Sequence, residues 1–153
     1  VPGYGDYGAY LKRLVEELGV AGRVTFLGAL DYEEAVPRYL AAADLFLSPS
    51  HIEGLNRVVA EAGALGTPSV VSAGTGIAPL VRETGAGIVV PVQDAAGLAQ
   101  AAASLAQDAG ARAAAAQRAQ ALAEQFSARA VAEGLLKLYE EAGADQLDHL
   151  RPF

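Results

Sequence analysis

The chain contains no cysteine, no methionine and only two histidines. Each of these shortages excludes a kind of functional site or, for methionine, a translation start at residue 1. Without cysteine there is no disulfide, no thiolate metal ligand and no cysteine nucleophile. Because His51 and His149 are the only imidazoles, we expect no histidine-rich metal site. No cofactor is expected. Since methionine is absent, residue 1 is not a translation start, and the sequence predicts a fragment of a longer protein.

Basic residues are scarce and scattered. Eleven Lys and Arg stand against eighteen Asp and Glu, which gives a formal net charge of −7. A nucleic-acid partner requires a basic stripe, so we expect no such partner. No stretch reaches the ~18 apolar residues of a membrane span, and the N-terminus lacks the features of a signal peptide. We therefore expect a cytoplasmic protein without a transmembrane segment.

The length and composition favour one globular domain. The 153 residues are 52% hydrophobic, which suffices for a core. Helical and strand-like patterns alternate up to residue 91, which predicts an α/β fold with a doubly wound parallel sheet. The expected helices are 8–18, 31–43, 56–65 and 76–84, and the expected strands are RVTFLG (23–28), DLFLS (44–48), TPSVVSA (67–73) and AGIVVP (86–91).

Several helix boundaries carry local signals. Asp31 is the expected N-cap of the second helix, with Glu34 three positions later in a capping-box arrangement. Pro37 then requires a place in the first turn or a kink, and Pro79 is expected to interrupt the helix at 76–84. From Asp94 onward, three alanine-rich helices are expected at 94–110, 111–126 and 127–143, followed by a surface tail at 145–153.

The most informative segment is PSHIEGLNRVVAEAGALGTPSVVSAG, residues 49–74. This segment directly follows the strand DLFLS. It places Glu53 just before a short helix and Glu61 inside that helix. The carboxyl ends of parallel strands are where open α/β sheets bind nucleotides. The helix N-terminus attracts anions, so a diphosphate fits over Gly54, Leu55 and Asn56. Carboxylates beside it suit sugar hydroxyl groups, which donate hydrogen bonds.

This order of segments resembles the C-terminal, donor-binding domain of retaining GT-B glycosyltransferases, specifically glycosyltransferase family 4. The most specific mark is glutamate, seven residues, glutamate, from Glu53 to Glu61, after a strand that leads into Pro-Ser and before Gly-Thr-Pro. The resemblance covers nearly the whole chain. It implies a Rossmann-like fold that forms the C-terminal half of a GT-B architecture.

The resemblance also implies a role for each residue of the motif. Glu61 would hold the ribose hydroxyls, and Glu53 would face the transferred sugar as the catalytic candidate. Backbone N–H groups of the loop and of the turn Gly74-Thr75-Gly76 would contact the diphosphate or sugar, without a metal. The nucleotide-sugar ligands expected from the sequence are Glu61, Gly54, Leu55, Asn56, Arg57, Gly74, Thr75 and Gly76.

The function implied is transfer of a hexosyl group from a nucleoside-diphosphate sugar to a sugar, lipid-linked or other hydroxyl acceptor, with retention of configuration. The sequence lacks the opening strand and helix with their basic pair, and it lacks the acceptor-binding N-terminal domain. We therefore expect residues 1–153 to be a donor-binding domain that is inactive alone. A missing central strand leaves backbone groups unpaired, so a strand-swapped or edge-paired homo-oligomer is one expectation.

Other interpretations share these features. A non-catalytic module that binds a nucleotide or a sugar phosphate has the same loop and the same glutamates. A purely structural α/β unit, or an epimerase of similar architecture, is less well supported, because an epimerase depends on histidine and carboxylate acid–base groups and His51 is the sole histidine near the cleft. The identities of the base, the sugar and the acceptor are left open by the sequence.

Overall fold

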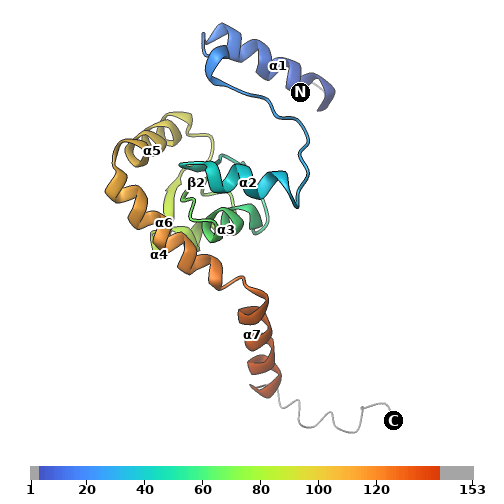
Figure 1. The fold of residues 1–153 in the computed structure, drawn as a ribbon, viewed down its shortest axis with the longest axis vertical. Helices are drawn as coiled ribbons and strands as arrows, with labels where there is room; N and C mark the ends of the chain where they lie inside the picture. The colour runs from blue at the N-terminus through green and yellow to red at the C-terminus, as the bar shows by residue number, and fades with distance from the viewer. Residues whose placement is uncertain (1–3, 142–153) are drawn as a thin grey trace. The chain divides into compact units, whose positions relative to one another are not determined.

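Figure 1 shows a computed structural model that describes residues 4–141 of the chain. The surface tail expected at 145–153 lies outside the described residues. The chain divides into two compact units, Val1–Asp31 and Tyr32–Phe153, which we describe separately.

The first unit is helical. Helix α1 (Tyr4–Glu17) starts earlier than the expected residue 8, and it is followed by a short 3-10 helix, η1 (Ala21–Arg23). The rings of Tyr7 and Tyr10, three residues apart on one face of α1, stack with their centroids 5.9 Å apart. Pairs at this spacing lie on the same side of a helix and support it, which accounts for the longer helix.

The strand expected at RVTFLG does not form, so that prediction is wrong. Arg23 ends η1, and residues 24–28 belong to no strand, although Val24 has extended backbone angles. Val24, Phe26 and Leu27 are exposed. A strand is stable only when a neighbouring strand pairs its N–H and C=O groups, and no described residue pairs with this segment.

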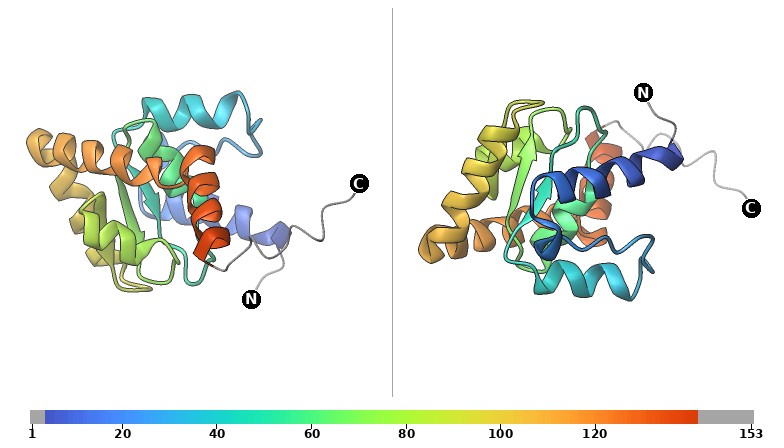
Figure 2. Two further views of the ribbon diagram at one scale, coloured as in Figure 1. Left: turned by 90° about the horizontal axis from the view of Figure 1, so that it is seen from below. Right: turned by 90° about the horizontal axis from the view of Figure 1, so that it is seen from above.

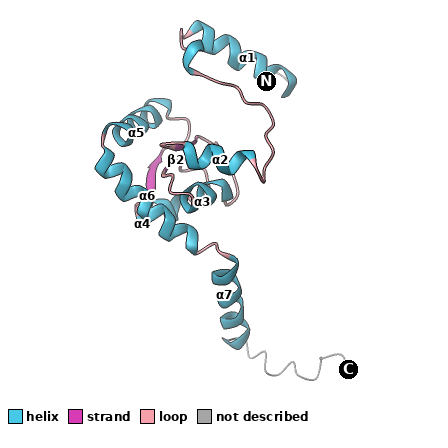
Figure 3. Cartoon of the chain, viewed as in Figure 1, coloured by secondary structure: helices cyan, strands magenta, loops and turns pink. Residues whose placement is uncertain are grey.

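The second unit contains a parallel sheet of three strands, β1 (Phe46–Ser48), β2 (Ser69–Ser72) and β3 (Gly87–Val90), in the order β1-β2-β3. Their positions in the chain agree with the predicted strands. Figure 3 shows strand residues in magenta, with β2 labelled, among helices in cyan. Every residue of β2 is buried, as expected for a strand covered on both faces. The parallel α/β class predicted from the sequence is confirmed.

Helices cover both faces of the sheet. Val71 of β2 packs against α3 (Arg57–Ala64), α4 (Ala78–Thr84) and one part of α6 (Ala109–Glu124). Val70, on the opposite face, packs against α5 (Ala95–Gln107), and Figure 2 shows α3 and α5 on opposite sides of the strands. The apolar periodicity of the sequence is therefore satisfied by two core layers.

Helices α2 (Ala35–Ala42) and α4 start later than expected. Helix α2 begins four residues after Asp31, which is therefore not its N-cap. Pro37 lies in the first turn of α2, where its missing N–H needs no helical partner. Pro79 is the second residue of α4 and so starts that helix; it does not interrupt it.

The alanine-rich region forms three capped helices, as predicted. Asp94, Asp108 and Ser127 precede α5, α6 and α7 (Ala128–Glu141), and each accepts a hydrogen bond from the backbone N–H three residues later, at 2.8, 2.8 and 3.2 Å. The boundary between α5 and α6 falls at Asp108 instead of the expected residue 110, because this side chain caps α6. None of the helices between residues 4 and 141 combines the length and apolarity needed to cross a bilayer.

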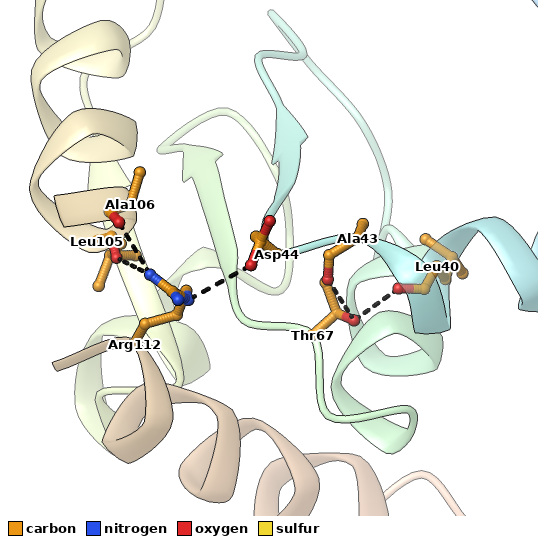
Figure 4. Close-up of polar contacts among 7 residues, drawn as sticks. All are labelled: Leu40, Ala43, Asp44, Thr67, Leu105, Ala106 and Arg112. Carbon is orange, nitrogen blue, oxygen red and sulfur yellow. Dashed lines mark hydrogen bonds and ion pairs between the residues drawn. The ribbon is translucent and has the colours of Figure 1, made fainter. Parts of the chain in front are cut away.

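Two polar side chains bond to the ends of helices α2 and α5 (Figure 4). The hydroxyl of Thr67, between α3 and β2, donates to the carbonyl of Leu40 at 2.6 Å and thereby holds the end of α2. Arg112 of α6 donates to the carbonyls of Leu105 and Ala106 at the end of α5, at 3.0 and 2.9 Å. These contacts hold the end of α2 and the end of α5.

Candidate functional site

The loop after β1 and the turn after β2 lie side by side at the carboxyl edge of the sheet. The backbone N–H of Glu53 donates to the carbonyl of Gly74 at 3.0 Å, and the N–H of Gly76 donates to the carbonyl of Gly54 at 2.6 Å. Glu53 and Thr75 form an isolated parallel bridge. The structure thus brings together two segments that the sequence placed in the site separately.

The glycines of the second turn are required by this close packing. A Cβ atom on Gly74 would lie 2.1 Å from the carbonyl oxygen of His51, and one on Gly76 would lie 2.6 Å from that of Gly54. The N–H groups of Thr75 and Gly76 bond within the two loops. The turn 74–76 is thus bonded to the first loop, and its contact with a ligand stays a prediction.

The first turn of α3 opens onto a depression of about 400 Å³. Asn56, the N-cap residue, has left-handed backbone angles, with φ 61° and ψ 64°, and its side chain makes no capping bond. The first N–H groups of a helix have no partner inside that helix. The residues that line this depression are Tyr32, Glu53, Gly54, Leu55, Asn56, Arg57 and Val58.

Glu53 is exposed, and its Oε2 accepts a hydrogen bond of 2.9 Å from the hydroxyl of Ser50. Ser50 precedes Glu53 by three residues in the same loop, so the bond fixes the carboxylate from its own segment. Because Glu53 also lines the depression, its carboxylate is available to accept hydrogen bonds from a bound sugar.

Glu61 lies farther along α3, half-buried, and its Oε1 accepts a hydrogen bond of 2.5 Å from the hydroxyl of Tyr32. It borders a second depression of about 460 Å³ with an apolar wall from Val36, Leu40 and Leu65. Tyr32 lines this depression as well as the first, so it stands where the two adjoin.

Tyr32 was not identified from the sequence. The hydrogen bond to Glu61 is the main reason that the pKa of Tyr32 is raised, while the charge of Arg57 acts in the opposite direction. The only sequence signal for Tyr32 is its place just after a candidate strand, 29 residues before its partner. Its partnership with Glu61 is set by the packing of α2 on α3, which no local pattern reveals.

The remaining candidates are placed as follows. Arg57 is exposed in the first turn of α3 and lines the depression, whereas His51 is exposed in the loop. Within residues 4–141 there is no cluster of three or more His, Asp or Glu side chains able to hold a metal ion. The donors available at this site are thus backbone N–H groups and one guanidinium, a set suited to an anion.

The fold and the site define an α/β domain with an anion-suited loop at the carboxyl edge of a parallel sheet. Residues 1–122 match the family described as Glycosyl transferases group 1, and the chain belongs to this family. The D-inositol 3-phosphate glycosyltransferase of Salinispora tropica is 36% identical over 144 residues, which are 94% of this chain and 30% of that protein. The chain spans about a third of the length of the curated relatives it matches.

Solved structures agree with this assignment. The Anabaena protein Alr3699/HepE, solved in complex with UDP, is similar with a TM-score of 0.79 and 27% identity over 90% of this chain and 38% of that one. Sucrose-phosphate synthase from Thermosynechococcus elongatus has a TM-score of 0.77 and 31% identity, over 90% of this chain and 34% of that one. Both neighbours are GT-B glycosyltransferases, and the predicted Rossmann-like half of a GT-B fold is confirmed.

Proposed function

We propose that residues 1–153 form the donor-binding domain of a retaining, family 4 glycosyltransferase. The observation that carries the proposal is the loop at 49–56, which places Glu53 and the open first turn of α3 around one depression, with Glu61 on the adjoining one. Membership of the Glycosyl transferases group 1 family and the likeness to a protein that binds UDP support a nucleoside-diphosphate sugar as the ligand.

In the proposed complex, the diphosphate lies over the first turn of α3. Backbone N–H groups there and the positive end of the helix dipole meet its charge, and Arg57 adds a cation. When the bond between the sugar and the phosphate breaks, negative charge grows on the leaving diphosphate. Fixed donors aimed at this charge lower the barrier without a metal.

The two glutamates bind the two sugars of the donor. Glu61 accepts hydrogen bonds from the ribose hydroxyls; in support, its Oε1 already accepts one from a hydroxyl group, that of Tyr32. Glu53, held by Ser50, accepts hydrogen bonds from the transferred hexose and lies beside the developing positive charge of its ring. Its carboxylate therefore favours the charged state of the sugar over the neutral one.

The acceptor half of the reaction is assigned to a domain other than residues 1–153. That domain holds a sugar, lipid-linked or other hydroxyl acceptor, whose oxygen forms the new bond to the sugar as the bond from the sugar to the diphosphate breaks, and whose proton passes to the leaving diphosphate. Transfer needs both reactants in one cleft, so residues 1–153 bind the donor and do not transfer sugar by themselves. We assign the whole enzyme to the cytoplasm, because its proposed substrates are nucleoside-diphosphate sugars.

Calorimetric titration of the chain with UDP, GDP and ADP tests the proposal. We expect one of them to bind, and Glu61→Ala to weaken that binding by roughly 10-fold or more, the loss typical of hydrogen bonds to a charged group. The loss should disappear with the 2′,3′-dideoxy form of the same nucleotide. Glu83→Ala, an exposed glutamate of α4, is the matched control. A folded chain that binds none of the three at millimolar concentration contradicts the proposal.

A further inference from the structure

Buried polar side chains gather under the loop that follows β1. Ser48, Asn56, Ser72 and Thr75 are all buried, and all lie in this loop, at its ends or in the neighbouring turn. A buried polar group is stable only when it is hydrogen-bonded. The loop is thus held by a set of directional bonds, which fix its geometry more sharply than apolar packing does.

Asn56 is the central member of this set. It is 6% exposed, it has φ 61°, and its Nδ2 donates to the hydroxyl of Ser48 at 2.7 Å. A left-handed conformation is unfavourable for a residue with a side chain, so the bond to Ser48 helps to hold it. The side chain consequently points back to the end of β1.

The direction of this side chain decides what the helix N-terminus can bind. Asp94 and Asp108, the caps of α5 and α6, use their side chains to bind the first N–H groups of their own helices. Asn56 makes no such bond. An asparagine N-cap usually accepts a hydrogen bond from the first turn, and here the lock onto Ser48 prevents this. In α3 the N–H of Val59, the position that is capped in α5 and α6, donates to the backbone carbonyl of Asn56 at 3.1 Å. The N–H groups of Arg57 and Val58, the first two of the helix, are the ones left for an external acceptor.

The same bond is the first step of a chain that ends at Glu53. Ser50 donates its single hydroxyl proton to Oε2 of Glu53. The hydroxyls of Ser48 and Ser50 lie 3.4 Å apart, and because the proton of Ser50 is already used, Ser48 is the donor of the bond between them. The hydroxyl of Ser72 in β2 donates to the backbone carbonyl of Ser50 and anchors the middle of the chain. The order of donation runs from Asn56 to Ser48, Ser50 and Glu53.

We propose that Asn56 and Ser48 are positioning residues for the donor. Their hydrogen bond keeps the first turn of α3 open to a diphosphate and, through Ser50, holds the sugar-facing carboxylate of Glu53 in register with it. The inference rests on the proposed function and adds to it the device that sets the spacing between the phosphate and sugar subsites.

The test compares UDP and inorganic pyrophosphate as probes of the full chain. Asn56→Gly keeps the left-handed conformation, because glycine adopts it freely, but removes the amide; Ser48→Ala removes its acceptor. Each change should lower the affinity for both probes about fivefold, as for one lost hydrogen bond. The double variant should be no weaker than either single one, because both changes remove the same bond. Glu61→Ala should weaken the binding of UDP and leave the binding of pyrophosphate unchanged.

A stability-matched control separates positioning from folding. Thr67→Val removes a buried hydroxyl bond at the far end of α3, so it should lower the melting temperature and leave UDP affinity unchanged. Wild-type affinity in Asn56→Gly and Ser48→Ala, or losses that add fully in the double variant, overturns the inference while the proposed function stands. If the unmodified chain binds neither probe, the proposed function and this inference both fail.

Discussion

The hydroxyl of Tyr32 donates a 2.5 Å hydrogen bond to Oε1 of Glu61, the carboxylate that we assign to ribose. Tyr32 precedes α2 and Glu61 lies in α3, so the bond joins two elements at the mouth of the site. A ribose that approaches Glu61 meets an acceptor already oriented by a phenol. The hydrogen bond between these two side chains can be tested by a spectroscopic measurement of the pKa of Tyr32.

The titration of Tyr32 should report its bond to Glu61. Only the neutral phenol donates, and the bond raises the pKa of Tyr32 above the ordinary value of 10.0. The bond is therefore intact below pH 10 and is lost as the pH rises through the raised pKa. Tyrosinate absorbance, taken as the difference between the unmodified chain and Tyr32→Phe, measures this pKa. Glu61→Gln should lower it.

The control for this titration is Glu83→Gln, which removes a carboxylate from the exposed side of α4. It should leave the pKa of Tyr32 unchanged. An equal shift in Glu61→Gln and Glu83→Gln would mean that overall charge, and not the hydrogen bond, raises the pKa. No shift in Glu61→Gln would mean that the bond does not persist in solution.

The parallel sheet and most helix boundaries were predictable because their signals are local. Apolar runs such as DLFLS and TPSVVSA identify buried strands, and Asp94 marks a helix start by its own side chain. The pairing of strands in chain order follows from the alternation with helices. The site motif was recognisable for the same reason, since only seven residues separate Glu53 from Glu61.

The failures concern contacts that are not local. RVTFLG has the residues of a strand, but pairing depends on a neighbour that the segment itself cannot specify. Tyr32 meets Glu61 only through the packing of α2 on α3. Likewise, the sequence shows that Gly74 is a glycine, but only the loop packed against it shows why.

Gly74→Ala should destabilise the second unit. The new Cβ would lie 2.1 Å from the carbonyl oxygen of His51 and 2.8 Å from its carbon, and these are backbone atoms that cannot rotate away. We expect a cost of about 1–3 kcal/mol, as for overpacking, and a fall of several degrees in the melting temperature. Thermal unfolding followed by circular dichroism measures the change.

Gly134→Ala is the matched control, since a Cβ there meets nothing within 4 Å. Gly134 lies inside α7, where alanine is favoured over glycine by about 0.5–1 kcal/mol, so this variant should keep or raise the helical signal. If Gly74→Ala melted at the unmodified temperature, the loop after β1 would have to be movable, and the close pairing of Glu53 with Thr75 would not be a rigid feature of the site.

Arg112→Ala tests which contact of this side chain stabilises the fold (Figure 4). Arg112 has two kinds of partner: the carbonyls of Leu105 and Ala106 at 3.0 and 2.9 Å, and the carboxylate of Asp44 at 3.7 Å. The arginine side chain is 27% exposed and that of Asp44 is 82% exposed. Solvent screens the ion pair, whereas the bonds to the end of α5 are short and charge-assisted.

We therefore expect unequal costs in urea unfolding. Arg112→Ala should lower the free energy of unfolding by about 1.5–3 kcal/mol, the range for hydrogen bonds to a charged group, and Asp44→Ala by at most about 1 kcal/mol. Arg129→Ala, which removes only an exposed pair with Glu133, should cost about 0.3–0.5 kcal/mol. Equal losses in Arg112→Ala and Asp44→Ala would show that the ion pair dominates. In that case α6 would be held by attraction to the carboxylate of Asp44 before β1, and high salt should reduce the cost of Arg112→Ala. Bonds to the carbonyls of α5 instead predict that this cost changes little with salt.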